Sequence, residues 1–141
     1  GSNPHYEELR SRISHMKLSV RLERDVTRMS ELMAWADVAL SGAGSTCWEL
    51  AFMGVPMVLY ILAEDQRKIA EALDGNGIAI NLGWYTDLSK EALSKALMGL
   101  VGNRKLRESM SEKGRALVDG FGSNRVLQTL EKTPTMPIRT K

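Results

Sequence analysis

The sequence predicts an α/β fold in which helices flank a parallel sheet, and three features support this. Apolar segments with helical spacing alternate along the chain with short apolar runs of strand length. One such run, Pro56–Leu62, is apolar throughout, as expected of a strand that is buried on both faces. Glycine and proline separate the segments, as in Gly54-Val55-Pro56. Strands that alternate with helices in this way are typical of a parallel sheet.

Each expected element has its own signal. Asn3-Pro4 precedes the first helix, Val26, Met29, Leu32 and Met33 have helical spacing in the second, and Gly54 ends the third. After Gly83 the pattern is purely helical. The predicted helices are His5–Ser14, Asp25–Ala36, Ser45–Met53, Glu64–Leu73, Leu88–Val101, Arg104–Val118 and Ser123–Leu130. The predicted strands are Met16–Val20, Asp37–Ser41, Pro56–Leu62 and Gly77–Leu82. We therefore expect one domain over residues 1–132, followed by a flexible tail over residues 133–141, which contains two prolines.

Composition narrows the function classes. The 141 residues are enough for one domain, and 43% of them are hydrophobic, which is a globular composition. The net charge of +2 is too small to indicate nucleic-acid binding. No apolar run approaches the roughly 18 residues that span a bilayer, and no signal peptide is evident. Cys47 is the only cysteine, which excludes an internal disulfide and fits a cytoplasmic location.

The central motif is a glycine turn between a strand and a helix. It reads Ser41-Gly42-Ala43-Gly44-Ser45-Thr46. Glycine has no Cβ, so the backbone N–H groups of such a turn can approach a phosphate closely. The following helix directs its free N–H groups and its positive dipole end at the same place, and Ser45 and Thr46 add hydroxyl groups. The turn therefore predicts a pyrophosphate site at the carboxyl end of a strand, with Gly42, Gly44, Ser45 and Thr46 as its residues.

Three polar side chains are further candidates. Glu49 follows in the first turn of that helix, where its carboxylate could accept hydrogen bonds from ribose hydroxyls or could instead close a capping box onto Thr46. Asp65 and Gln66 follow the next buried strand, so they could face the same crevice or could simply begin a helix. The sequence contains no metal-ligand spacing, and we expect neither a metal nor a cofactor.

Together these segments resemble a known family. Met29–Asp37, Ser41–Glu49, Gly54-Val55-Pro56 and Ala63-Glu64-Asp65-Gln66 are similar to the C-terminal domain of the UDP-sugar hydrolases of pseudaminic acid biosynthesis and of the spore-coat polysaccharide biosynthesis proteins. More distantly they resemble the lipid II N-acetylglucosaminyltransferases. The resemblance implies a Rossmann-like GT-B C-terminal domain that lacks its first two strands and binds UDP or a UDP-sugar.

The resemblance also implies roles and partners. Gly42, Gly44, Ser45 and Thr46 would hold the pyrophosphate, Glu49 the ribose, and Asp65 and Gln66 would face the nucleotide–sugar crevice. The catalytic histidine of the family belongs to an N-terminal domain, so we assign no catalytic residue here. An uncovered edge strand predicts pairing with a second copy. Two alternatives remain open, a non-catalytic interaction module such as one half of a split glycosyltransferase, and a fragment of a dinucleotide oxidoreductase, against which the incomplete G-x-G-x-x-G pattern counts.

Overall fold

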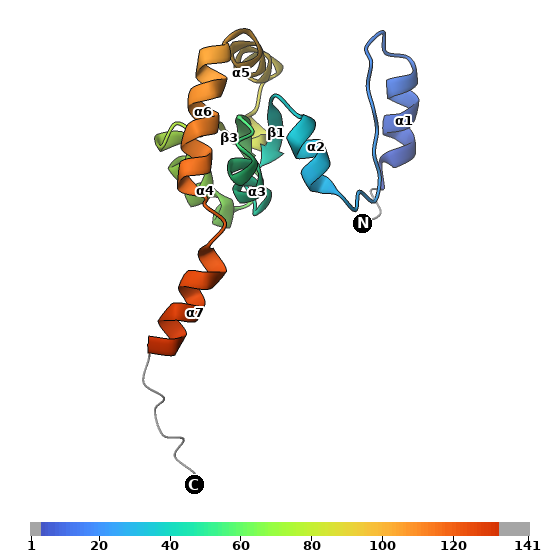
Figure 1. The fold of residues 1–141 in the computed structure, drawn as a ribbon. Coiled ribbons are helices and arrows are strands. Elements are labelled where there is room, and N and C mark those ends of the chain that lie inside the picture. The colour runs from blue at the N-terminus through green and yellow to red at the C-terminus, as the bar shows by residue number, and fades with distance from the viewer. Residues whose placement is uncertain (1–3, 133–141) are drawn as a thin grey trace.

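The computed structural model describes residues 4–132 and has a parallel sheet at its centre. The three strands are β1 (Ala39–Gly42), β2 (Met57–Ile61) and β3 (Ala79–Trp84), in the order β1-β2-β3. Helix α3 (Thr46–Met53) connects β1 to β2, and helix α4 (Glu64–Gly75) connects β2 to β3. Figure 1 shows these elements packed together in one body. The predicted α/β class and parallel sheet are confirmed.

Strand β2 separates two apolar clusters because successive side chains of a strand point to opposite faces. Met57, Leu59 and Ile61 lie in a cluster with buried residues of α3 and α4. Val58 lies in the other cluster, with Leu100 of helix α5 (Lys90–Gly102) and Met110 of helix α6 (Arg104–Leu117). Helices therefore cover both faces, which explains the uninterrupted apolar run of this strand.

Two glycines allow α3 to pack closely against α6. Gly54 ends α3 in the left-handed conformation with φ of 71°, and an added Cβ there would collide with the guanidinium of Arg115. Gly114 is buried in α6, where an added Cβ would lie 2.9 Å from the carbonyl oxygen of Ala51. Since α3 carries the glycine turn at its amino end, this contact supports the candidate site.

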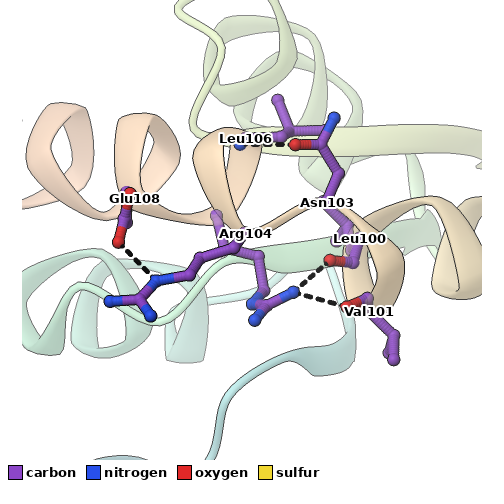
Figure 2. A network of polar contacts seen from close by, with 7 residues as sticks. Leu100, Val101, Asn103, Arg104, Leu106 and Glu108 are labelled. Carbon is purple, nitrogen blue, oxygen red and sulfur yellow. Dashed lines mark hydrogen bonds and ion pairs between the residues drawn. The ribbon is translucent and has the colours of Figure 1, made fainter.

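The corner between α5 and α6 is held by polar contacts (Figure 2). Asn103 caps α6 by accepting a hydrogen bond from the Leu106 N–H at 3.0 Å. Arg107 donates hydrogen bonds to the carbonyl oxygens of Leu100 and Val101 at 2.7 and 2.6 Å. These two carbonyl groups lie in the last turn of α5, where the helix itself offers them no partner. The break between the predicted helices Leu88–Val101 and Arg104–Val118 is thus confirmed.

The remaining elements lie around this body or extend from it. Helix α1 (Tyr6–Ser14) and helix α7 (Gly122–Lys132) extend away from it in Figure 1, whereas helix α2 (Met29–Trp35) packs beside α3. A short 3-10 helix, η1 (Tyr85–Asp87), follows β3. The predicted tail, residues 133–141, lies outside the described residues.

Two predictions about the first part of the chain are wrong. Residues 16–20 form no strand, because no neighbouring strand in the described sheet offers them hydrogen bonds and all five residues are exposed. The helix expected to begin at Asp25 begins instead at Met29. Asp25 has a left-handed backbone with φ of 50°, which a right-handed helix cannot include.

Candidate functional site

The carboxyl ends of β1 and β2 bring the two predicted motifs together. Beyond β1 the chain turns sharply, with the Gly44 N–H donating to the Gly42 carbonyl at 2.8 Å, while the Ala43 N–H donates to the Tyr60 carbonyl at 3.0 Å and so extends the sheet by one bond. The Gly42 carbonyl also accepts from the Ser41 hydroxyl at 3.0 Å and the Cys47 thiol at 3.5 Å. The Gly42 carbonyl oxygen therefore has its hydrogen bonds within the turn, so it does not compete with a bound anion for other donors.

The turn leaves backbone donors available. The helix begins with the Cys47 N–H bonded to the Gly44 carbonyl at 3.1 Å and the Trp48 N–H bonded to the Ser45 carbonyl at 3.0 Å. Among the hydrogen bonds between described residues, none uses the N–H of Ser45 or of Thr46. Both residues are exposed and stand at the positive end of α3. Adjacent free N–H groups at a helix start can bind a phosphate.

Gln66 joins the second motif to the first. Its side-chain oxygen accepts a hydrogen bond from the Leu62 N–H at 3.0 Å, at the carboxyl end of β2. Its side-chain nitrogen lies 3.8 Å from the position that a Cβ on Gly44 would occupy. The amide group therefore has its oxygen engaged and its NH₂ donor beside the glycine turn. A Cβ at position 44 would meet this amide at ordinary van der Waals distance, so Gly44 and the Gln66 amide lie next to each other.

Glu49 does not form the capping box that the sequence also allowed. No hydrogen bond within residues 4–132 links its carboxylate to the Thr46 backbone. Ser45, the residue before α3, already has helical backbone angles, φ of −58° and ψ of −29°, so Thr46 lies inside the helix and is not its cap. The carboxylate is exposed and lies one turn beyond the free N–H groups. It also lines a mostly apolar groove of about 500 Å³ between α2, α3 and the segment after α6. Its geometry leaves it free to accept hydrogen bonds.

Asp65 is exposed in the first turn of α4, next to Gln66, and within the described part of the chain its carboxylate has no hydrogen bond or ion pair. Acidic side chains are concentrated here, since Glu49 lies in the first turn of α3, Glu64 and Asp65 lie in the first turn of α4, and Glu64 pairs with Arg67. An anionic ligand at the turn would thus depend on backbone N–H groups, hydroxyl groups and the helix dipole.

Cys47 is buried in α3, and the two histidines lie at the ends of α1. Cys47 is fully buried, and burial raises the pKa of its thiol to about 11, so the thiol is neutral near pH 7. His5 and His15 flank α1, which extends away from the sheet in Figure 1.

Trp84, at the end of β3, packs against the core and is not a free stacking surface. It is half-buried against the core cluster, and the Arg67 guanidinium carbon lies 5.7 Å from the centre of its ring. Tyr85 is 53% exposed. The contact between Arg67 and Trp84 had no signal in the sequence, because the two residues belong to different elements.

Another hollow, of about 490 Å³, lies at the opposite edge of the sheet, beside Asp37 and Pro56. Three arginines, Arg104, Arg107 and Arg115, line it together with three carboxylates, Asp37, Glu108 and Glu112, and Arg104 pairs with Glu108 at 2.8 Å (Figure 2). The formal charges of this hollow are therefore balanced. Across residues 4–132 no three His, Cys, Asp or Glu residues are grouped to hold a metal. No helix in that range has the length and apolar character to cross a membrane.

Comparison with known proteins gives a consistent result. Residues 1–121 match the model of the glycosyltransferase family 28 C-terminal domain. The chain is 31% identical over 130 residues to the spore coat polysaccharide biosynthesis protein SpsG of Bacillus subtilis, covering 92% of this chain and 38% of that protein. It is 30% identical over 138 residues to the UDP-N-acetylglucosamine--N-acetylmuramyl-(pentapeptide) pyrophosphoryl-undecaprenol N-acetylglucosamine transferase of the same organism, covering 91% of this chain and 37% of that protein.

A solved structure extends this similarity to the fold. The crystal structure of MurG from Acinetobacter baumannii superposes with a TM-score of 0.79 at 24% identity, covering 92% of this chain and 39% of that one. The chain thus spans less than two-fifths of the length of each of these three proteins.

Proposed function

The chain belongs to the glycosyltransferase family 28 C-terminal domain family, and from this we propose that it binds the nucleotide part of a UDP-sugar. One observation carries the proposal: the side-chain amide of Gln66 lies next to Gly44, beside the free N–H groups of Ser45 and Thr46. Three kinds of donor, namely backbone N–H groups, hydroxyls and a side-chain amide, converge on one place. A diphosphate is the part of a nucleotide-sugar that such a set of donors fits.

The remaining site residues extend this proposal. Glu49, free of a capping bond, would accept hydrogen bonds from the ribose hydroxyls. Asp65 and Gln66, at the start of α4, would face the crevice that holds the nucleotide and the sugar. During reaction the leaving nucleotide gains negative charge, and the preorganised N–H groups of Ser45 and Thr46 would stabilise it without a metal. Donors that are fixed before reaction cost no reorganisation when the charge develops.

We further propose that the chain acts as the C-terminal half of a UDP-sugar hydrolase or GT-B glycosyltransferase, in the synthesis of a surface polysaccharide or a nonulosonic acid, in the cytoplasm. The similarity to proteins named for spore coat polysaccharide synthesis and for N-acetylglucosamine transfer supports this. The attacking water or hydroxyl group and the catalytic residue would then belong to a partner N-terminal domain.

The test is a titration with UDP followed through backbone amide chemical shifts, with NAD and AMP as controls. We expect UDP-selective shifts at residues 42–49 and 64–66. Glu49→Ala should weaken UDP binding by about 1–3 kcal/mol, since it removes hydrogen bonds between a charged group and the ribose. Glu91→Ala is the matched control, because Glu91 lies in the first turn of α5, away from the glycine turn. Loss of thermal stability in Glu49→Ala with unchanged affinity would contradict the ribose role.

Asp65 tests the charge argument separately. A carboxylate beside a diphosphate opposes its binding, so Asp65→Asn should tighten binding of UDP. Unchanged affinity at low and at high salt would mean that the Asp65 side chain does not face the phosphates.

The outer edge of β1 supports a second association. In the described sheet β1 pairs with β2 alone, so its other edge presents unpaired backbone groups. We propose that this edge pairs with a strand of another chain, either a second copy or the partner domain. Light scattering over a concentration series should show a mass that rises toward a dimer, and a constant monomer mass would exclude self-pairing.

A further inference from the structure

Arg67 connects the end of β3 to the start of α4. Its guanidinium lies over the ring of Trp84, 5.7 Å from the ring centre, and it also pairs with Glu64 at 2.9 Å. Trp84 is half-buried against the core cluster of the sheet, so its ring is a fixed surface. Arg67 is itself 46% exposed and uses a planar group that can stack and form an ion pair at once. One side of the first turn of α4 is thereby tied to β3.

The opposite side of the same turn is tied to β2. Gln66 precedes Arg67 and accepts the hydrogen bond from the Leu62 N–H at 3.0 Å. Glu64, Gln66 and Arg67 all belong to the first turn of α4, so their backbones move together. The side-chain nitrogen of Gln66 faces Gly44 only while this turn keeps its place between β2 and β3. A binding group is effective when the residues behind it hold it in the bound geometry.

We propose that Arg67 is a positioning residue of the nucleotide site, which, stacked on Trp84, fixes the start of α4 and thereby holds the Gln66 amide opposite Gly44. This inference rests on the proposed function for its ligand, and Arg67 acts through Gln66 without touching the nucleotide. The alternative is a surface contact that contributes only to stability. The two readings differ in what happens to Gln66 when Arg67 is changed.

The first measurement needs no nucleotide. In Arg67→Ala, the side-chain NH₂ signals of Gln66 should move toward those of a free glutamine, and hydrogen exchange at the Leu62 N–H should become faster. Arg104→Ala is the matched control, because Arg104 forms a similar exposed pair with Glu108 on α6. Unchanged Gln66 signals in Arg67→Ala would overturn the proposal whether or not UDP binds. Failure of the wild-type protein to bind UDP would refute the proposed function alone.

The second measurement is a double-mutant cycle on UDP affinity. Exposed cation–π contacts are worth about 0.5–1 kcal/mol, so Arg67→Ala should weaken UDP binding roughly two- to fivefold, and Arg67→Lys, which keeps the charge but loses the planar stack, should fall between. In a Gln66→Ala background, Arg67→Ala should have no further effect. Additive losses would overturn the proposal, because they would place Arg67 in independent contact with the ligand. Trp84→Phe keeps an aromatic face and should retain the wild-type affinity, whereas a loss as large as that of Arg67→Ala would count against the stack.

Discussion

Replacement of Gly114 by alanine should destabilise the protein through one contact between helices. An added Cβ at position 114 would lie 2.9 Å from the Ala51 carbonyl oxygen and 3.3 Å from the Ala51 Cα. Both are backbone atoms of α3, so no side-chain rotation can relieve the contact and the two helices must move apart. Overpacking costs about 1–3 kcal/mol, and we expect the upper part of this range, about 2–3 kcal/mol, because backbone atoms cannot rotate away; the higher helix propensity of alanine offsets about 1 kcal/mol. We expect a net loss of about 1–2 kcal/mol in the free energy of unfolding.

Gly99 provides the control within the same protein. It lies in α5, and a Cβ added there would meet no heavy atom within 4 Å. Gly99→Ala should therefore stabilise the protein by about 0.5–1 kcal/mol through helix propensity and chain entropy alone. The opposite signs of the two substitutions separate the contact at Gly114 from the intrinsic preference of a helix for alanine.

The assay is urea unfolding of the three proteins, followed by circular dichroism, with the m-values compared to confirm that the unfolded states are alike. Because α3 carries the free N–H groups at its start, Gly114→Ala should also lower the affinity of any ligand that binds at the glycine turn. The reasoning is refuted if Gly114→Ala is as stable as the wild-type protein while Gly99→Ala is more stable. In that case α3 and α6 would not be in tight contact at this crossing.

Two predictions concern pH. Burial raises the pKa of the Cys47 thiol from 9.0 to about 11, so the stability linked to this group is complete below pH 9 and declines as the pH rises from 9 to 11, by about 2 to 3 kcal/mol in all. Urea midpoints at pH 8 and pH 10.5 should differ more for the wild-type protein than for Cys47→Ala, and equal differences would contradict this. Arg125 donates two hydrogen bonds to Asp119, at 2.7 and 3.0 Å, and holds the pKa of that carboxyl at about 2 instead of 3.8. The contribution of this pair is present above about pH 4 and is lost as the pH falls through 2. A carbon NMR titration should show this midpoint, and Arg125→Ala should return it toward 3.8; a midpoint that stays near 2 in that variant would assign the shift to another group.

Local features of the sequence determined the class of fold and the place of the glycine turn. The apolar run 56–62 predicts a strand that is buried on both faces, because a strand with one face in solvent alternates apolar and polar residues. The structure places this strand, β2, in the middle of the sheet. The glycine turn 41–46 lies between a strand and a helix as expected, because glycine conformations and helix caps are local properties. These features depend on residues close together in the chain, so spacing alone reveals them.

Contacts between distant residues were decided only by the tertiary structure. The meeting of Gln66 with Gly44, the stack of Arg67 on Trp84 and the fit of Gly114 against Ala51 each join separate elements, and no periodicity encodes them. The sequence around Glu49 was compatible both with a capping box and with an unbonded carboxylate. In the structure Ser45 already has helical backbone angles, and the Glu49 carboxylate forms no capping bond. Residues 16–20 have strand-like composition but form no strand, because a strand requires a neighbour for its hydrogen bonds and the described sheet provides none.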